Sequence, residues 1–189
     1  MEVATAPPAS PVASEHRTRE VAMLLFELHR EPRASGHLTA EVAEKVLNRC
    51  VLTALEVLTG AGAEVVVAGT TKRPVVEARF EGEGAAGHAA RAAHEVLVGV
   101  RRVQRARENE FHVVGAIAAG RATLGPDGVT VTLGRGDVLL HRLREAAAPG
   151  EILMSASARQ ACVDAVVTVA VPPVAGGEVE AYLLRGIRT

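Results

Sequence analysis

The order of the apolar segments is the feature of this sequence that most constrains its fold. The first segment, Glu20–Leu28 (EVAMLLFEL), is apolar throughout except at its ends, is short, and is followed by Pro32. Such a run predicts a strand that is covered on both faces. In residues 42–58 the apolar positions recur at steps of three and four, which predicts an amphipathic helix with Thr39 as its N-cap and Gly60 at its end.

The segments that follow complete a familiar order of elements. Two short β-branched runs, Glu64–Ala68 and Val75–Phe80, are separated by a polar stretch that contains Gly and Pro, and they predict a β-hairpin. A second helical period runs from Gly84 to about Arg107, and Phe111–Ala119 predicts another strand. Strand, helix, strand, strand, helix, strand is the order of a ferredoxin-like βαββαβ core, in the mixed α/β (α+β) class.

The C-terminal third extends this core with further short elements. A turn is expected at Pro149-Gly150, and the last two strands should be joined by a loop rich in Pro and Gly. The predicted elements are a strand at Val129–Leu133, a helix over residues 136–147, a strand at Glu151–Met154, a short helix at Ser155–Val163, and strands at Val166–Val171 and Val179–Leu184.

The composition favours one domain with an aliphatic core. Of the 189 residues 48% are hydrophobic but only 2% are aromatic, so Val, Leu, Ala and Ile must fill the interior. Residues 1–18 are rich in Pro, Ala and Ser, and they offer too little periodic apolar surface to offset the entropy cost of ordering. We therefore expect a flexible N-terminal tail over residues 1–18 and a single domain over residues 19–189.

Charge and cysteine content exclude several classes of partner. With 21 Lys and Arg against 22 Asp and Glu, the formal charge is -1, which creates no field that would draw the chain to nucleic acid or to a bilayer. Cys50 and Cys162 stand in apolar surroundings without a Cys-x-x-Cys pair, so both are expected to be buried reduced thiols. No secretory signal and no membrane-spanning apolar run is recognisable, which predicts a cytoplasmic protein.

One long stretch carries a resemblance to a known family. Gly134–Ala158 (GRGDVLLHRLREAAAPGEILMSASA) resembles, without gaps, the part of class III adenylate and guanylate cyclases that reads Gly, two variable residues, Val-Asn, a small-residue step, Arg-Leu and then Ala-x-Pro-Gly-Glu-Ile-Leu. Val21–Leu28, Gly115–Ala122 and Ala181–Gly186 are similar to that family's first strand, its Gly-Ile-His-Thr-Gly strand and its closing strand. The pieces span nearly all of residues 20–189 in the family's order, which implies the fold of a cyclase homology domain.

The resemblance also implies where metal ions would bind. Class III cyclases join the ribose 3′-hydroxyl to the α-phosphorus with two metal ions, which two Asp side chains hold. Glu27 stands at the position of the first Asp, and Pro74, which offers no ligand atom, falls at the second. Because the extra methylene of Glu27 would displace a Mg²⁺ ion of strict geometry, we expect no Mg²⁺ or Mn²⁺ cofactor and interpret Glu27 as a vestigial metal position.

The positions that contact the nucleotide in the family are also changed. Thr70 and Val131 stand where the family reads the purine, and Val138 replaces the Asn that orients the ribose and cannot form its hydrogen bond. Arg142 matches the transition-state Arg of the family and is the one retained group. Near the C-terminal half of its helix, Arg142 also suits a role in which it only faces the helix dipole and solvent. Arg142 and Thr70 are thus the candidate nucleotide contacts.

These losses predict a degenerate cyclase domain without turnover of its own. The favoured hypothesis is a dimerising signalling or scaffold module, as a homodimer or as a heterodimer with another cyclase-like domain or a signalling protein. One alternative is a sensor domain that binds a small ligand, or a nucleotide without metal, in the old cleft. Another is the half of a heterodimeric cyclase that supplies Arg142 to a partner carrying the metals.

Overall fold

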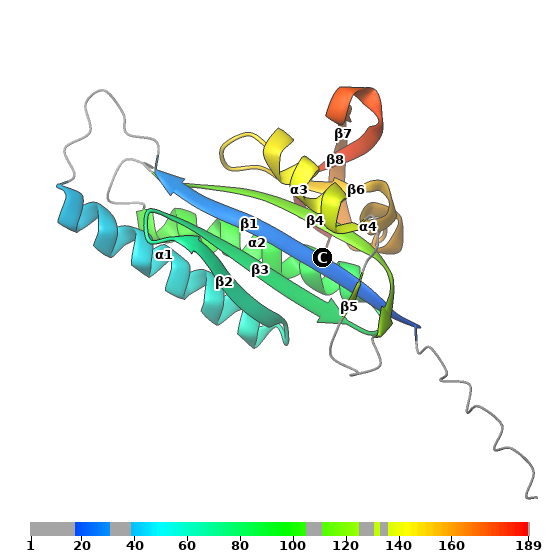
Figure 1. Ribbon diagram of the computed structural model, residues 1–189, viewed down its shortest axis with the longest axis horizontal. Coiled ribbons are helices and arrows are strands. Elements are labelled where there is room, and N and C mark those ends of the chain that lie inside the picture. Colours follow the sequence, from blue (N-terminus) through cyan, green and yellow to red (C-terminus); the bar gives the residue numbers. More distant parts are fainter. Residues whose placement is uncertain (1–17, 31–38, 105–110, 125–130, 133–135, 189) are drawn as a thin grey trace, which may run out of the picture.

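A computed structural model describes residues 18–30, 39–104, 111–124, 131–132 and 136–188. These residues form one sheet in the order β2-β3-β1-β4-β6-β8-β7, with the short strand β5 paired to β4 (Figure 1). All neighbours in the sheet are antiparallel except β4 and β6, which are parallel. The elements are β1 (Thr18–Arg30), α1 (Ala40–Gly60), β2 (Glu64–Thr70), β3 (Arg73–Glu81), α2 (Ala85–Gln104), β4 (Phe111–Leu124), β5 (Val131–Thr132), α3 (Gly136–Ala146), β6 (Ile152–Ser155), α4 (Ala156–Ala161), β7 (Val166–Val174), the 3₁₀ turn η1 (Ala175–Gly177) and β8 (Val179–Ile187).

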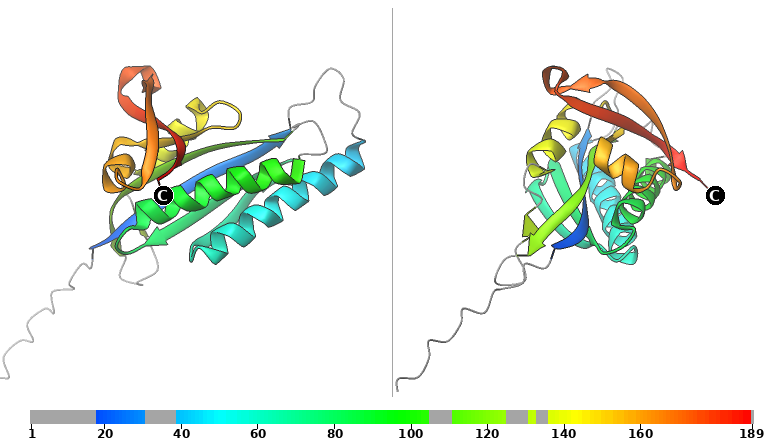
Figure 2. Two further views of the ribbon diagram at one scale, coloured as in Figure 1. Left: turned by 180° about the vertical axis from the view of Figure 1, so that it is seen from behind. Right: turned by 90° about the vertical axis from the view of Figure 1, so that its right-hand side faces the viewer.

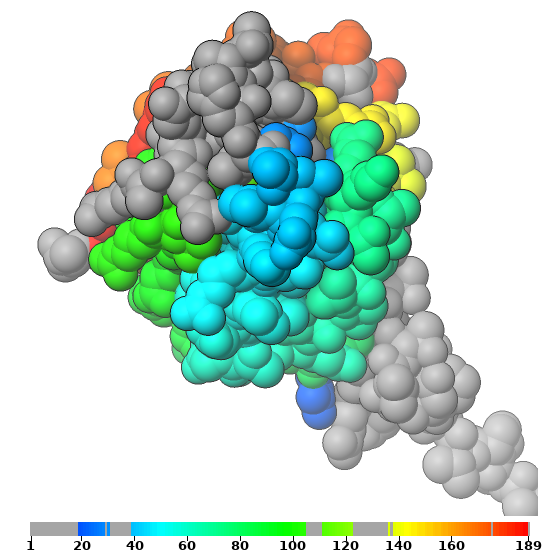
Figure 3. All heavy atoms as spheres, turned by 90° about the vertical axis from the view of Figure 1, so that its left-hand side faces the viewer, coloured from blue at the N-terminus to red at the C-terminus, as the bar shows by residue number. Residues whose placement is uncertain are grey.

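Helices cover the two faces of this sheet unequally. The long helices α1 and α2 lie together on one face, and α3 lies on the other (Figures 1 and 2). Two apolar clusters correspond to these layers: a large one beneath α1 and α2, and a smaller one in which Leu140 and Leu143 of α3 meet Leu25, Ala116 and Leu153 of the sheet. In the space-filling view α1 and β2 lie side by side at one end of the molecule (Figure 3).

The alternation of side chains along β1 determines which residues reach each layer. Leu24 and Phe26 are fully buried in the cluster under α1 and α2, whereas Leu25 is fully buried in the cluster under α3. Because successive residues of a strand point to opposite faces, Glu27 lies on the α3 face with Leu25. The apolar run of β1 is therefore explained by burial on both faces, as its sequence predicts.

Gln104 fastens the end of α2 to the start of β4. Its side chain donates from Nε2 to the carbonyl of Phe111 at 2.7 Å and accepts from the N–H of Phe111 at 2.8 Å. Both residues are buried, with Gln104 3% exposed. Through these two bonds the side-chain amide takes the place of a peptide group of a neighbouring strand.

The predicted elements within the described residues are confirmed, with some corrections at their ends, and of the predicted strand Val129–Leu133 only Val131–Thr132 is described. Thr39 caps α1 by accepting a hydrogen bond from the N–H of Val42 at 3.3 Å, as expected. The predicted tail falls outside the described residues except for Thr18, the first residue of β1, and the expected helix end at Arg107 lies outside them too. Pro172 and Pro173, predicted as loop, belong to β7, which is possible because β7 is an edge strand and Pro cannot donate to a ladder.

The structure also bears on the expectations for the cysteines and for membrane spans. Cys50 and Cys162 are both buried, as predicted. Burial raises the pKa of the Cys50 thiol from 9.0 to about 11. Burial also raises the pKa of the Cys162 thiol, while the positive charge of Arg91 lowers it by a smaller amount.

Among the helices that the structure describes, none combines the length and the apolar character that crossing a bilayer requires.

Candidate functional site

The Glu27 carboxylate is held by two arginines on the α3 face of the sheet. Its side chain is only 7% exposed. Oε1 accepts from Nε of Arg73 at 2.7 Å and lies 2.6 Å from Nη2 of the same guanidinium. Oε2 accepts from Nη1 of Arg144 at 2.7 Å. Each carboxylate oxygen thus has its own guanidinium, and the three side chains are named here the Glu27 triad.

Local structure explains why Arg73 reaches Glu27. β2 and β3 are joined by a tight turn in which the N–H of Arg73 donates to Oγ1 of Thr70 at 3.1 Å. In the register of β3 on β1, Val75 lies opposite Glu27, and Arg73 stands two residues from Val75 on the same face. The side chain of Arg73 is 67% exposed, so it approaches Glu27 from the solvent side.

Arg144 approaches the same carboxylate from the helix above the sheet. It lies in the last turn of α3, where a positive charge also interacts favourably with the helix dipole. Its side chain is 22% exposed, much less than that of Arg73. Hydrogen bonds between ionised partners are the stronger kind, and screening by water is weak where the partners are largely buried. The contact between Arg144 and Glu27 is therefore the more stabilising of the two.

Pro74, which the resemblance places at the second metal position, does not lie beside Glu27. Pro74 is buried in β3 with Val76 and Ala78, on the face that α1 and α2 cover. The neighbouring residue that lies beside Glu27 is Arg73, whose side chain brings a positive charge instead of a second carboxylate. Thr70 is exposed at the end of β2, where its hydroxyl closes the hairpin turn.

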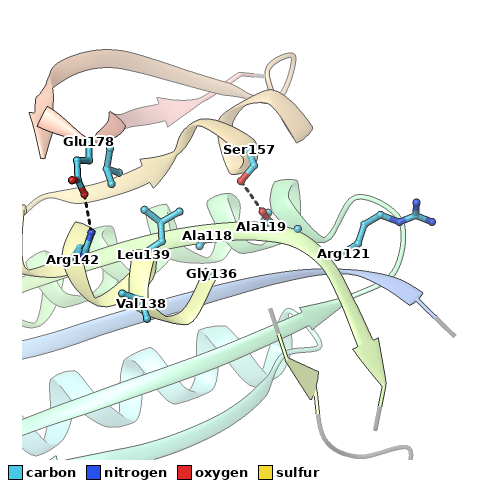
Figure 4. A pocket seen from close by; sticks show the side chains of 11 residues that line it. Ala118, Ala119, Arg121, Gly136, Val138, Leu139, Arg142, Ser157 and Glu178 are labelled. Atoms are coloured by element: carbon cyan, nitrogen blue, oxygen red, sulfur yellow. Dashed lines mark hydrogen bonds and ion pairs between the residues drawn. The ribbon is translucent and has the colours of Figure 1, made fainter. Parts of the chain in front are cut away.

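Val138 and Arg142 of α3 border a pocket whose lining does not include Arg144. The pocket, of about 610 Å³, is lined by the small residues of β4 from Ala118 to Gly120, by Val138 and Arg142 of α3, and by residues of α4, β8 and the link before β8 (Figure 4). Arg142 turns toward Glu178, with Nη1 3.6 Å from Oε2, and both side chains are well exposed. Val138 is 57% exposed. Val131 lies in β5, and its side chain is outside the part that the structure describes.

The residues around Glu27 do not fit a divalent metal ion. Within the described residues no three His, Cys, Asp or Glu side chains come together as a metal site, and Glu27 is the only buried carboxylate. Mg²⁺ is held through carboxylate oxygens in strict octahedral geometry. Here both oxygens of the one candidate ligand already accept hydrogen bonds from cations. The arrangement can neutralise a buried charge, but it cannot offer that charge to a metal ion.

The arginines of the triad are the functional residues that sequence reasoning missed. Arg73 falls in the polar stretch between the two predicted strands of the hairpin, and Arg144 falls in the predicted helix over residues 136–147. For Arg73 a signal was present, because the alternation of Val75, Glu77 and Arg79 along the strand places residue 73 on the same face. For Arg144 none was present, because its partner is 117 positions away.

Comparison with known proteins finds structures similar to this fold among nucleotide cyclase domains. No family model and no curated protein matches this chain. Among solved structures, the adenylyl cyclase CyaB from P. aeruginosa is 20% identical, with 91% of this chain and 97% of that chain covered and a TM-score of 0.64. The guanylyl cyclase Cya2 is 19% identical, with 92% and 95% covered and a TM-score of 0.66.

A further similar structure is described as dimeric. It is a guanylyl cyclase domain of the RhoGC fusion protein from the aquatic fungus Blastocladiella emersonii. That domain is 15% identical to this chain, with 91% of this chain and 99% of that chain covered and a TM-score of 0.60. At these identities the comparisons establish the fold, which is that of adenylyl and guanylyl cyclase domains.

Proposed function

We propose that this chain, which has the fold of nucleotide cyclase domains, does not cyclise nucleotides and works as a module that associates with a second copy or with another cyclase-like domain. The observation that carries the proposal is the state of Glu27. Its carboxylate is buried, and each oxygen is bound by a guanidinium. A divalent ion would have to displace these bonds and sit beside two positive charges.

The chemistry of cyclisation shows why this matters. Two metal ions stabilise the attacking and the leaving oxygen, and the protein contributes positioning and charge neutralisation. Loss of a single preorganised electrostatic contact typically costs roughly 10²–10³ in rate. In this chain the metal ligands are replaced by the Glu27 triad, and Val138 cannot form the hydrogen bond that the resemblance expects of an Asn. Arg142 alone would not restore turnover.

The exposed part of the α3 face supports association with a similar domain. α3 packs on β1, β4 and β6, while the same face of β2 and β3 carries Val66, which is 57% exposed, and the partly buried Val75. Val66 lies there among the ion-paired side chains of Glu64, Arg79 and Glu81, and such a mixture of apolar and charged groups is what a non-obligate interface presents. The near-neutral charge of -1 leaves little repulsion between two copies.

The test is a cyclase assay with ATP and with GTP in Mn²⁺, run beside light scattering on the full chain. We expect no product above background and a mass that rises with concentration toward that of a dimer. Product at a rate well above background that is lost in Glu27→Gln would refute the inactive assignment. A mass that stays monomeric at the highest concentrations would refute self-association, and mixing with an active cyclase domain would then test the heteromeric form.

The pocket near Arg142 favours a second candidate function, the binding of a small ligand. Small residues of β4 line it together with Arg121, Arg142 and the carboxylate of Glu178, which suits a ligand that carries an apolar body and polar or anionic groups. Thermal-shift measurements with ATP, GTP and cyclic nucleotides test this candidate. Stabilisation without metal that Arg142→Ala removes would support a sensor. Stabilisation that needs Mn²⁺ would favour half of a heterodimeric cyclase instead.

We expect the module to act in the cytoplasm. This expectation rests on the sequence, in which Cys50 and Cys162 lack a paired motif, as is usual for proteins of a reducing compartment.

A further inference from the structure

We propose that Arg73 and Arg144 are built-in counterions that take over the role of a bound divalent ion, and that these two residues determine that this domain excludes metal. The inference rests on the proposed function, which it deepens by naming the residues responsible. The buried carboxylate of the fold is retained as Glu27, while its compensating positive charge comes from the chain itself.

The balance of charge supports this role. A buried carboxylate must be paired with positive charge, because an isolated one is very costly to remove from water. One carboxylate with two guanidiniums has a net charge of +1, which is also the charge of one carboxylate with a divalent ion. The Glu27 triad therefore gives the site the charge that a metal would give it, without any exchangeable ion.

The geometry of the Glu27 triad resembles that of a metal site in the way it joins separate elements. Arg73 comes from the hairpin turn, Arg144 from the end of α3 and Glu27 from the central strand β1, so three separate elements meet at one carboxylate. A metal ion bound between side chains of different elements ties them together in the same way. The guanidinium of Arg144 is largely buried, and leaving it unpaired is unfavourable.

Neighbouring cations do not share this role, and they provide matched controls. Lys72 precedes Arg73 in the same turn and is exposed. Arg142 lies on the same helix as Arg144 but pairs with Glu178. The double variant Lys72→Asp/Arg142→Ala therefore changes the net charge by the same amount, on the same elements, as Arg73→Asp/Arg144→Ala. Only the latter frees Glu27 and places a second carboxylate near it.

The test is Mn²⁺ binding to the full chain, measured by electron paramagnetic resonance of the free ion and by calorimetry. Arg73→Asp/Arg144→Ala is expected to bind Mn²⁺ about tenfold or more tightly than Lys72→Asp/Arg142→Ala. The gain should disappear when Glu27→Gln is added. The unaltered chain is expected to bind no better than the control variant.

The possible results separate this inference from the proposed function. If Arg73→Asp/Arg144→Ala folds, as judged by circular dichroism, but binds no better than the control, the inference is overturned while the inactive assignment stands. If the unaltered chain binds Mn²⁺ and Glu27→Gln abolishes it, both are overturned. Should the double variant not fold, Arg73→Asp is compared with Lys72→Asp. Equal binding by these two then overturns the inference, and tighter binding by Arg73→Asp supports it.

Discussion

Arg144 donates a hydrogen bond to Glu27 at 2.7 Å although the two residues are 117 positions apart in the chain. This contact joins the first strand of the sheet to the helix on its less covered face. It is also the more buried of the two contacts in the Glu27 triad. Its removal should therefore lower the stability of the domain as well as the positive charge beside Glu27.

Removing Arg144 should destabilise the domain more than removing Arg73. Arg144→Ala leaves a buried carboxylate with one partner, and we expect a loss of about 2–4 kcal/mol in the free energy of unfolding. Arg73→Ala breaks a pair whose arginine is 67% exposed, and we expect a loss below about 1 kcal/mol. Urea denaturation followed by circular dichroism measures both, with Arg142→Ala as the control on α3. Equal losses for Arg73→Ala and Arg144→Ala would contradict the assigned difference in burial.

Much of the fold could be predicted from the sequence, but the partners of Glu27 could not. The apolar run of β1 and the cap at Thr39 depend on residues close together in the chain, so their pattern reveals them directly. The Glu27 triad depends on the crossing of α3 over β1, which no local pattern encodes. Counting along the hairpin could not show which face each residue of β3 occupies, and the structure places Pro74 on the face opposite to Glu27.

Gln104 should contribute more to stability than its charged neighbours on α2. Gln104→Ala removes two buried hydrogen bonds and leaves the N–H and the carbonyl of Phe111 without these partners. We expect a loss of about 2–4 kcal/mol in the free energy of unfolding, against less than about 0.5 kcal/mol for Arg102→Ala on the exposed side. Chemical denaturation of both variants checks this. If Gln104→Ala lowers the free energy of unfolding no more than Arg102→Ala does, the two hydrogen bonds of the Gln104 amide do not stabilise the contact between α2 and β4.

Two glycines of α2 should respond to alanine with opposite signs. A Cβ at Gly99 would lie 2.8 Å from Cγ2 of Thr53 on α1, whereas a Cβ at Gly87 would meet its nearest atom at 3.8 Å. Gly99→Ala should therefore cost about 1–3 kcal/mol through overpacking, and Gly87→Ala should stabilise by about 0.5–1 kcal/mol through helix propensity.

The contact with Thr53 allows a direct control for the effect at Gly99. Thr53→Ala removes the methyl group in question, so the double variant Thr53→Ala/Gly99→Ala should recover most of the loss seen for Gly99→Ala. Thermal denaturation of the two single variants and the double variant forms a complete cycle. Additive losses in that cycle would rule out close packing of α1 on α2 as the cause.

The stability of the domain should decrease at alkaline pH because of Cys50. Burial raises its pKa from 9.0 to about 11, so the folded state holds the thiol proton more tightly than the unfolded state does. This contribution is complete below pH 9 and is lost as the pH rises toward 11, and it amounts to at most about 3 kcal/mol. Cys50→Ala should show a flatter dependence of unfolding free energy on pH over this range. The same slope in both proteins would speak against the raised pKa.

The two prolines at the end of β7 limit how this sheet can grow. Pro172 and Pro173 have no N–H to offer at the outer edge of the sheet, so an additional strand could form a regular ladder only along the Val166–Val171 part of β7. Pairing of β7 with an edge strand of another copy is therefore unfavourable at Pro172 and Pro173. Such protection leaves association to the other surfaces of the domain, so that copies can meet there without growing into fibres.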